Sequence, residues 1–493
     1  MKKQVFNPIL PLNEYVPDVE PHVFGDRVYL YGSHDKEGGN TFCMLDYVVY
    51  SASIYDLKTW RCEGTIYSAK QDPDYPNRKY MYAPDVVRGN DGRYYLYYAM
   101  SGERGQGGYF GPISVAVCDT PAGKYEYLGC VKYSDGRTML DYVPFDPAVL
   151  NDNGTIRLYF GTQYDFEEQS DFYTNESYVE NEMNMFGKSR EEILEMSHKD
   201  SVMGAIGAVL DDDMLTIKEA PKHIIPYKVK GTTFENHPFF EASSMRKVGE
   251  MYYFVYSSKQ NHELCYATSK FPDRNFVFRG TIVSNGDVGY NGRSEENRLN
   301  MTGTTHGSIV NLNGVWYVFY HRLTHKSDYS RQVCAERIEI QQNGSISQVE
   351  ITSCGLNDEP LDASGMYPAV IACNITNGDM PHGSNKIFAE TFPNVNNCGE
   401  ERFISEIGNN TLIGYKYFDI QGNSLLKIVV RGNANGILFV RQSIEGENLG
   451  TFSIQPLQNW TEIETKCSFK NGKQALYLFF EGNGLFDLKE VGF

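Results

Sequence analysis

Five polar residues in the first two-thirds of the chain share one spacing. Each lies seven or eight residues before a glycine that opens a segment rich in tyrosine and phenylalanine. The polar residues are Asp18, Asp85, Asp146, Glu241 and His306, and the glycines are Gly25, Gly92, Gly154, Gly249 and Gly314. Because carboxylic acids and an imidazole are poor packing residues for a core, their shared position indicates a functional site.

Facing carboxyl groups are the chemical equipment for cleaving a glycosidic bond. One must be protonated, so that it can donate a proton to the leaving oxygen, and the other must be ionised, so that it can activate water or attack directly. A third carboxylate nearby can raise the pKa of the acid by like-charge repulsion. Clustered acids also bind calcium, but the sequence has no DxDxDG-type loop, which weakens that alternative.

The glycine segments predict the elements that position these residues. Each glycine separates two short apolar runs, as in GDRVYLYGS and GVWYVFYHR with their preceding strands, and such pairs are typical of β-hairpins. The glycines recur at intervals of 67, 62, 95 and 65 residues, which suit four-stranded propeller blades better than helical solenoids. Since equivalent positions of a radial repeat converge, we expect the five polar residues to ring one end of a central channel.

The longest interval and the C-terminal third depart from this repeat. An insertion runs from about residue 165 to residue 200, and its second half, SREEILEM, has helical periodicity. We expect either a wall over the channel mouth or a surface excursion without function. Residues 346–385 are predicted to be closing strands and a polar linker. Residues 386–493 resume short alternating strands, which are typical of a β-sandwich.

The composition agrees with an all-β fold. The 493 residues include 36 Tyr, 28 Phe and 46 Gly, which favours strands and turns. A net charge of −18 argues against nucleic acid or an anionic membrane as a partner, and no apolar run approaches the roughly 18 residues of a membrane span. The 10 cysteines lack paired spacing, so we expect free thiols and no zinc site.

The start of the chain, MKKQVFNPILPLNEY, is positively charged but lacks the apolar centre of a signal peptide. We therefore expect a cytoplasmic protein, or a secreted one whose leader has been removed. A cytoplasmic location favours small imported oligosaccharides over intact polymer as substrates. Nothing in the sequence indicates an oligomeric state.

The sequence around the five polar residues resembles glycoside hydrolase family 43. The matching segments are YVPDVEPHVFGDRVYLYGSHD, YAPDVV, FDPAVL, FFEASSMRK and THGSIVNLNGVWYVFYHR, and they cover roughly residues 5 to 345. The resemblance implies a five-bladed β-propeller over residues 1–345 and an inverting mechanism. It also implies β-xylosidase, α-L-arabinofuranosidase or arabinanase activity, without a cofactor for the chemistry.

The same resemblance implies roles for individual residues. Asp18 would be the general base, Glu241 the general acid, and Asp146 the residue that raises the pKa of Glu241 and orients it. Arg331 resembles a sugar-contacting arginine, whose planar donors could span adjacent hydroxyls or hold Asp18 ionised. His306 matches a residue that in many relatives lies on the channel axis near a bound calcium or water.

Three more residues are expected to support the site. Asp85 and Asp35 are predicted to hold it in place, and Asp85 is also a candidate for substrate binding. Tyr82, in YMYAPD, departs from the WAPDV form common in the family. Its ring could stack on a sugar or pack in the core.

Residues 386–493 resemble a family 6 carbohydrate-binding module. The matching segments are YKYFDIQGNSLLKIVVRG, NGILFVRQSIEGENLGTFSI, NWTEIETKCSF and KQALYLFFEGNGLFDLKEVGF. The resemblance implies a jelly-roll sandwich, with Glu390 and Asp487 where such modules often hold a structural calcium. The module could serve as a packing partner for the propeller and not as a polysaccharide anchor.

Together these patterns predict an exo-acting, inverting glycosidase that trims xylose or arabinofuranose units from hemicellulose-derived oligosaccharides. Two alternatives remain open at this point. One is a retaining furanosidase on the same fold, in which the second acid is a nucleophile. The other is a non-catalytic sugar-binding propeller.

Overall fold

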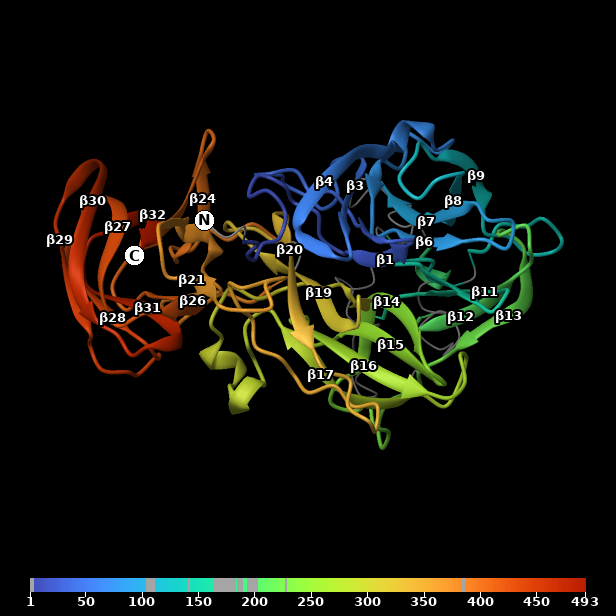
Figure 1. Cartoon of the computed structure of the whole chain (residues 1–493). Coiled ribbons are helices and arrows are strands. Elements are labelled where there is room, and N and C mark those ends of the chain that lie inside the picture. The colour runs from blue at the N-terminus through green and yellow to red at the C-terminus, as the bar shows by residue number, and fades with distance from the viewer. Residues whose placement is uncertain are drawn as a thin grey trace.

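The computed structural model of the chain describes residues 4–102, 111–140, 142–163, 183, 189–192, 203–226, 228–383 and 386–493. Strands dominate this part of the chain, and Figure 1 shows them arranged in two bodies, a propeller and a smaller sandwich. Four 3-10 turns are η1 (Ala69–Gln71), η3 (Tyr290–Gly292), η4 (Glu295–Asn297) and η5 (Ala369–Ile371). Within the expected insertion, residues 190–192 are helical, and most of the remainder lies outside the described residues.

The propeller has five antiparallel blades that follow one another in the sequence. Blade 1 comprises β1 (Glu20–Phe24), β2 (Arg27–Tyr31), β3 (Tyr47–Ser53) and β4 (Asp56–Tyr67). Blade 2 comprises β5 (Tyr80–Met81), β6 (Asp85–Arg88), β7 (Tyr94–Ser101), β8 (Ile113–Cys118) and β9 (Glu126–Cys130). Blade 3 comprises β10 (Ala148–Asp152), β11 (Thr155–Phe160), β12 (Ile206–Leu210) and β13 (Ile217–His223).

The last two blades complete the ring. Blade 4 comprises β14 (Phe239–Val248), β15 (Met251–Ser258), β16 (Glu263–Ser269) and β17 (Val277–Ser284). Blade 5 comprises β18 (Ser308–Leu312), β19 (Val315–Leu323) and β20 (Arg331–Ile338). The first strand of each full hairpin lies innermost, because β1, β6, β10, β14 and β18 contact one another in a closed circle.

The five predicted hairpins are confirmed. Each glycine of the repeat occupies the turn between the first two strands of its hairpin and has a positive φ, between 58° and 94°. This left-handed conformation favours glycine, which explains why that residue type recurs there. The polar residue of each repeat is thereby placed at or just before the start of an innermost strand, except Glu241, which lies inside β14.

The start of the chain closes the propeller beside its three-stranded blade. The amide of Ile9 donates to the carbonyl of Val333, and the amide of Ala335 donates to the side chain of Asn7. The apolar residues Val5 and Ile9 pack in the same core cluster as blade 5. The first described residues therefore cover the edge of β20, which would otherwise be an unpaired strand edge.

Two six-stranded sheets pack face to face in the sandwich, around one apolar core. One sheet contains β21 (Leu361–Asp362), β23 (Asn374–Thr376), β26 (Leu412–Ile420), β28 (Asn435–Arg441), β29 (Gly450–Ile454) and β31 (Gly472–Asn483). The other contains β22 (Met366–Pro368), β24 (Asn394–Cys398), β25 (Glu401–Ile407), β27 (Asn423–Gly432), β30 (Leu457–Ser468) and β32 (Phe486–Gly492). Three short strands of the segment predicted as closing strands and linker thus pair within the sandwich sheets.

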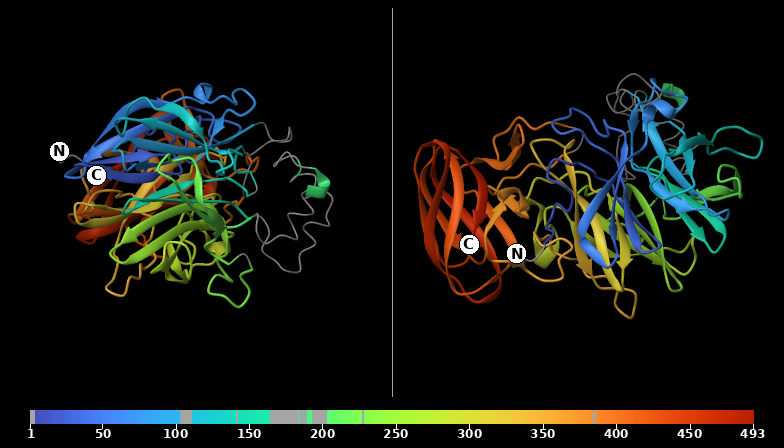
Figure 2. Two further views of the ribbon diagram at one scale, coloured as in Figure 1. Left: turned by 90° about the vertical axis from the view of Figure 1, so that its right-hand side faces the viewer. Right: turned by 45° about the horizontal axis from the view of Figure 1, so that its top comes forward.

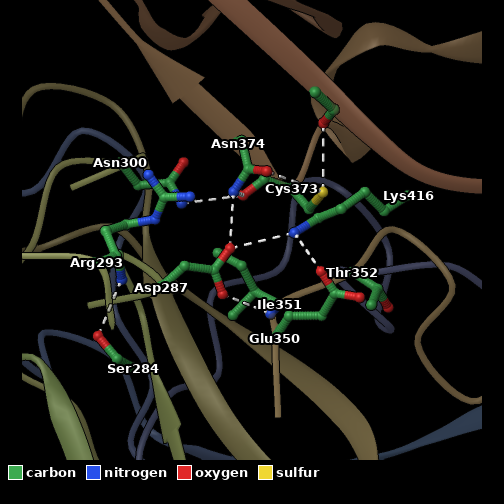
Figure 3. Close-up of polar contacts among 12 residues, drawn as sticks. Ser284, Asp287, Arg293, Asn300, Glu350, Ile351, Thr352, Cys373, Asn374 and Lys416 are labelled. Carbon is green, nitrogen blue, oxygen red and sulfur yellow. Dashed lines mark hydrogen bonds and ion pairs between the residues drawn. The ribbon is translucent and has the colours of Figure 1, made fainter. Parts of the chain in front are cut away.

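A largely buried polar cluster joins the two bodies, which lie side by side in Figure 1 and in the right view of Figure 2. We call Asp287, Glu350, Asn374 and Lys416 the junction cluster (Figure 3). The Nζ atom of Lys416, on β26, lies 3.2 Å from Asp287 Oδ2 and 3.0 Å from Glu350 Oε2. Asp287 follows blade 4, and its carboxylate also accepts hydrogen bonds from Asn374 Nδ2 and from the amide of Ile351. The sandwich is therefore fixed to the propeller by charges buried on both sides.

The cysteines and the helices of the described residues can also be compared with the sequence. All ten cysteines are free thiols, as predicted. The described part of the chain contains no helix with the length and hydrophobicity of a membrane span.

Candidate active site

Asp18 and Asp146 occupy the same unusual backbone conformation, just before β1 and β10. Their φ angles are 56° and 46°, and each residue is 4% exposed. Left-handed backbone is uncommon for residues other than glycine, although aspartate tolerates it better than most. Strain of this kind gathers at functional sites, where the surrounding structure holds a side chain in place.

Glu241 lies at an irregularity of β14. The register of β14 against β15 shifts on both sides of Glu241, and Ala242 has a φ of 67°. A β-bulge of this kind redirects a side chain relative to the regular strand. The amide of Ala242 donates to Asp146 Oδ2 at 3.0 Å, so the bulge also connects blade 4 to Asp146. Glu241 itself is half-buried and has no hydrogen-bond partner among the described residues.

Arg331 binds two carboxylates at once. Its Nη1 atom donates to Asp18 Oδ1 at 2.8 Å, while Nε and Nη2 donate to the two oxygens of Asp35 at 2.8 and 3.0 Å. The guanidinium lies over the ring of Phe42, 4.6 Å from its centroid. Because Arg331 is 4% exposed, this geometry supports the expectation that it holds Asp18 ionised. Asp35, which the sequence suggested as a supporting residue, thus contacts Arg331 through both of its carboxylate oxygens.

The sequence reasoning missed one neighbour of Asp18. His321, at the end of β19, accepts the Asp18 amide hydrogen at Nδ1 (3.3 Å), and its Nε2 lies 2.8 Å from the carbonyl of Thr304. These contacts place the imidazole proton on Nε2 and leave His321 neutral. Burial lowers the pKa of His321 in agreement with this tautomer. The signal was present as a polar His-Arg pair that ends the aromatic run VWYVFY.

The pKa values of Asp18 and Glu241 are shifted in opposite directions. Burial by itself would raise the pKa of Asp18, but the charge of Arg331 holds it well below its usual range. Burial and the nearby carboxylate of Asp146 raise the pKa of Glu241 well above its usual range. At neutral pH the first group is a carboxylate and the second a carboxylic acid.

Asp146 and His306 lie close to each other, and the pKa values of both are raised. Burial and the charge of Asp18 raise the pKa of Asp146 to about 6, against the opposing effect of His306. His306 Nδ1 is 3.6 Å from Asp146 Oδ2, and His306 Nε2 is 3.8 Å from Glu20 Oε1. Burial would lower the pKa of His306, but Glu20, Asp146 and Asp18 together raise it to about 9. The structure thus brings together five of the predicted site residues: Asp18, Asp146, Glu241, His306 and Arg331.

Two candidates for substrate contact, Asp85 and Tyr82, are buried and contact other protein groups. Asp85 is completely buried; its Oδ1 lies 2.5 Å from His22 Nε2, and its Oδ2 accepts the amide of Val149 at 2.7 Å. These bonds join blades 1, 2 and 3. Tyr82 is buried as well, with its ring centroid 5.2 Å from that of Phe145.

The predicted calcium residues of the sandwich are not brought together as a ligand set. Glu390 is exposed before β24, and Asp487 on β32 accepts a hydrogen bond from Arg431 Nε at 3.0 Å. Among the described residues, two groups of three side chains have metal-ligating atoms within 4.8 Å of one another. They are Glu20, His22 and Asp85 on the propeller axis, and His237, Glu263 and Cys265 in blade 4.

Known proteins resemble this chain over the propeller and beyond it. A family profile described as "Glycosyl hydrolases family 43" matches residues 5–346. A "Xylosidase/arabinosidase" from Thermoclostridium stercorarium is 43% identical, covering 99% of this chain and 98% of the relative. "Xylosidase/arabinosidase 43A" from Humicola insolens is 30% identical, covering 68% of this chain and 96% of the relative.

A solved structure agrees with these sequence matches. It is a family 43 β-xylosidase/α-arabinofuranosidase from a compost microbial metagenome, in complex with xylotriose and in a calcium-free form. The TM-score is 0.53 and the identity 26%, and the match covers 71% of this chain and 98% of that one. The protein is a glycosidase, and the chain belongs to glycoside hydrolase family 43, whose enzymes invert the configuration of the bond they cleave.

Proposed function

We propose that this enzyme removes xylose or arabinofuranose units from hemicellulose-derived oligosaccharides, with Asp18 as the general base and Glu241 as the general acid. The observation that carries the assignment is the opposite electrostatics of the two groups. Arg331 keeps Asp18 ionised, and burial beside Asp146 keeps Glu241 protonated. An inverting glycosidase needs this pair of protonation states at the same pH.

In the reaction, Asp18 removes a proton from a water molecule as the water oxygen attacks the anomeric carbon. Glu241 donates its proton to the glycosidic oxygen, which leaves as a hydroxyl. The anomeric configuration is inverted, and proton exchange with solvent restores both groups. Inversion requires roughly 6.5–9.5 Å between the two carboxyl groups, to leave room for the water.

The substrate class follows from the relatives and the chemistry of the site. The relatives carry both xylosidase and arabinosidase names, and one solved neighbour was captured with xylotriose. The protein's net charge of −18 suits a neutral glycan better than a phosphorylated or anionic one. We therefore propose short xylo- and arabino-oligosaccharides as substrates.

Calcium is the ion that the family resemblance associates with the propeller axis, although family 43 enzymes need no cofactor for their chemistry. The donor set around His306 does not fit it. Calcium takes about six to eight oxygen ligands, whereas the free donors facing each other here are one nitrogen, His306 Nε2, and one oxygen, Glu20 Oε1. The other oxygen of Glu20 already binds the guanidinium of Arg246.

The experiment compares hydrolysis of nitrophenyl β-xyloside and nitrophenyl α-L-arabinofuranoside, with the first-formed sugar anomer read by proton NMR. We expect inversion for each substrate that is cleaved. Glu241→Gln should lose most activity on a poor leaving group, which needs a proton. It should lose much less on a dinitrophenyl glycoside, which leaves without one.

The matched control is Glu336→Gln, the same substitution at a buried glutamate of β20 that hydrogen-bonds Thr352 and Tyr320. This variant should keep the parent rates. An equal loss on both leaving groups for Glu241→Gln would show that Glu241 is not the acid. Absence of hydrolysis of either pentoside by the parent would refute the substrate assignment.

A further inference from the structure

Carboxylates and imidazoles alternate along the axis of the propeller. This row of neighbouring side chains consists of Asp85, His22, Glu20, His306 and Asp146, and it ends beside Glu241. Four of the five innermost strands contribute to it, either directly or through the residues that precede them, and the fifth, β14, carries Glu241. Three of its members, Asp85, His306 and Asp146, were predicted from the repeat, but Glu20 has no place in the reaction described above.

One carboxylate oxygen of Glu20 accepts hydrogen bonds from described residues, and the other does not. It is 1% exposed, and its Oε2 accepts hydrogen bonds from Arg246 Nη2 and from Ser244 Oγ. Its Oε1 has no hydrogen-bond partner among the described residues, and neither has Nε2 of His306, which lies 3.8 Å away. A buried polar atom without a partner is costly. Two such atoms facing each other therefore point to a purpose for the pair.

We propose that Glu20 is a positioning residue that keeps His306 as an imidazolium, and that this charge keeps the proton of the Asp146–Glu241 pair on Glu241. The proposal rests on the proposed function of these two acids. It also accounts for the poor fit of calcium, because the positive charge on the axis is carried by a protein side chain.

The charges around His306 agree with this role. The ionisable groups that face it are Glu20 of β1, Asp18 before β1, Asp146 before β10, Glu241 of β14 and His321 of β19. Arg246 of β14 and His22 of β1 act on it through Glu20. Three of the facing groups are carboxylates that favour the imidazolium, and they raise the pKa of His306 to about 9.

The imidazolium then biases the acid pair. Two carboxyl groups that interact strongly share one proton at neutral pH, and the proton stays on the group whose ionised form is less stabilised. His306 lies 3.6 Å from Asp146, whose Oδ2 also accepts the amide of Ala242. Both contacts stabilise the carboxylate of Asp146, so the proton resides on Glu241, where the reaction needs it.

The test uses the full-length enzyme and the variants Glu20→Gln and Glu20→Asp. In enzyme labelled with ¹³C-histidine, the resonance assigned to His306 by its absence in His306→Gln is titrated by NMR. We expect the pKa of His306 to fall by about 1–3 pH units in Glu20→Gln and by less in Glu20→Asp, which keeps the charge. The value of kcat on a pentoside should fall about tenfold or more, and KM should change little.

The pH profile separates this role from a structural one. With a neutral His306, both acids of the pair become harder to ionise, so the alkaline limb of kcat should move to higher pH in Glu20→Gln. Glu336→Gln should move neither the NMR titration nor the pH limb. Thermal unfolding of each variant checks folding, and if Glu20→Gln does not fold, Glu20→Asp must show the same shifts at smaller size.

Several outcomes would overturn the proposal. An unchanged His306 titration in Glu20→Gln would show that Glu20 does not hold the imidazolium, and a changed titration with an unchanged pH profile would show that the charge does not reach the acids. Activation by CaCl₂ that is abolished by EDTA and by Glu20→Gln would assign the pair to a cation. Full activity in Glu241→Gln would instead refute the proposed function, while the NMR titration would still report on Glu20.

Discussion

The active site and the junction cluster both hold charged groups in buried positions, but they satisfy those charges differently. In the junction cluster, Lys416 has two carboxylates within 3.2 Å, and Asp287 receives two further hydrogen bonds. In the active site, Glu241 has no hydrogen-bond partner among the described residues, and Glu20 Oε1 and His306 Nε2 lie 3.8 Å apart without a hydrogen bond to any described residue.

The difference shows what each region is selected to do. A buried polar group without a partner costs more than a paired one contributes, so a region that only holds a fold together pairs its charges fully. A region that does chemistry keeps a group free for a substrate and tolerates the cost. Substitutions in the active site should therefore reduce activity with little loss of stability. Substitutions in the junction cluster should reduce stability with little loss of activity.

The largest expected effect is that of Asp18→Asn on activity. The amide cannot accept the proton of water, so kcat should fall by about 10³-fold or more on either leaving group. Stability should stay close to that of the parent, because asparagine also tolerates a positive φ and Arg331 keeps both bonds to Asp35. Steady-state kinetics and thermal unfolding measured together decide the point, and a loss of stability that matches the loss of rate would contradict the comparison.

Lys416→Met should have the converse effect. Removing the ammonium leaves the buried carboxylate of Asp287 and the partly exposed carboxylate of Glu350 without their cation, which costs about 3–5 kcal/mol of stability. Because Lys416 makes no contact with the acids of the active site, kcat per folded molecule should remain that of the parent. Urea unfolding and active-site titration measure the two quantities. Adding Asp287→Asn to Lys416→Met should recover part of the loss, and a double variant less stable than the single one would refute the assignment.

Asp146→Asn tests the electrostatics within the active site. The carboxylate of Asp146 raises the pKa of Glu241, so its removal should lower that pKa and move the alkaline limb of kcat to lower pH, by about 1–3 units. This direction is opposite to that expected for Glu20→Gln. At neutral pH the rate should fall about 10- to 100-fold, because less of the acid is protonated. A limb that moves upward would mean that Asp146 does not act through its charge.

The repeat in the sequence predicted which polar residues come together at the centre of the propeller, and the reason is geometric. Radial symmetry carries equivalent positions to one axis, so the spacing from each glycine was sufficient to gather Asp18, Asp146, Glu241 and His306. Asp85 shares the spacing but is buried, with its carboxylate in contact with His22 and the amide of Val149, which agrees with the supporting role expected for it. Family membership, and not the spacing, set aside the retaining and non-catalytic alternatives.

What the sequence did not predict depends on contacts between distant segments. The His-Arg pair after VWYVFY marks His321 as unusual in the sequence, but no local pattern indicates that it contacts Asp18, because the two residues belong to the last and first blades. The junction cluster is similar: Lys416 lies in a run of tyrosine, phenylalanine and aspartate that reads as an ordinary strand with an exposed lysine. Its burial follows only from the way the sandwich packs on the propeller.

The smallest effect sharpens the comparison by changing burial alone. Lys427 and Lys416 lie in the same sandwich and have similar carboxylate distances, since Lys427 Nζ is 3.1 Å from Glu462 Oε1. The side chain of Lys427 is 34% exposed, however, and that of Lys416 is 5% exposed. Lys427→Met should therefore cost less than about 1 kcal/mol, and less still at high salt, because water and ions already screen the exposed pair. If urea unfolding gave equal losses for the two lysines, burial would not be what makes the junction pair matter, and the contrast between satisfied and unsatisfied charges would lose its physical basis.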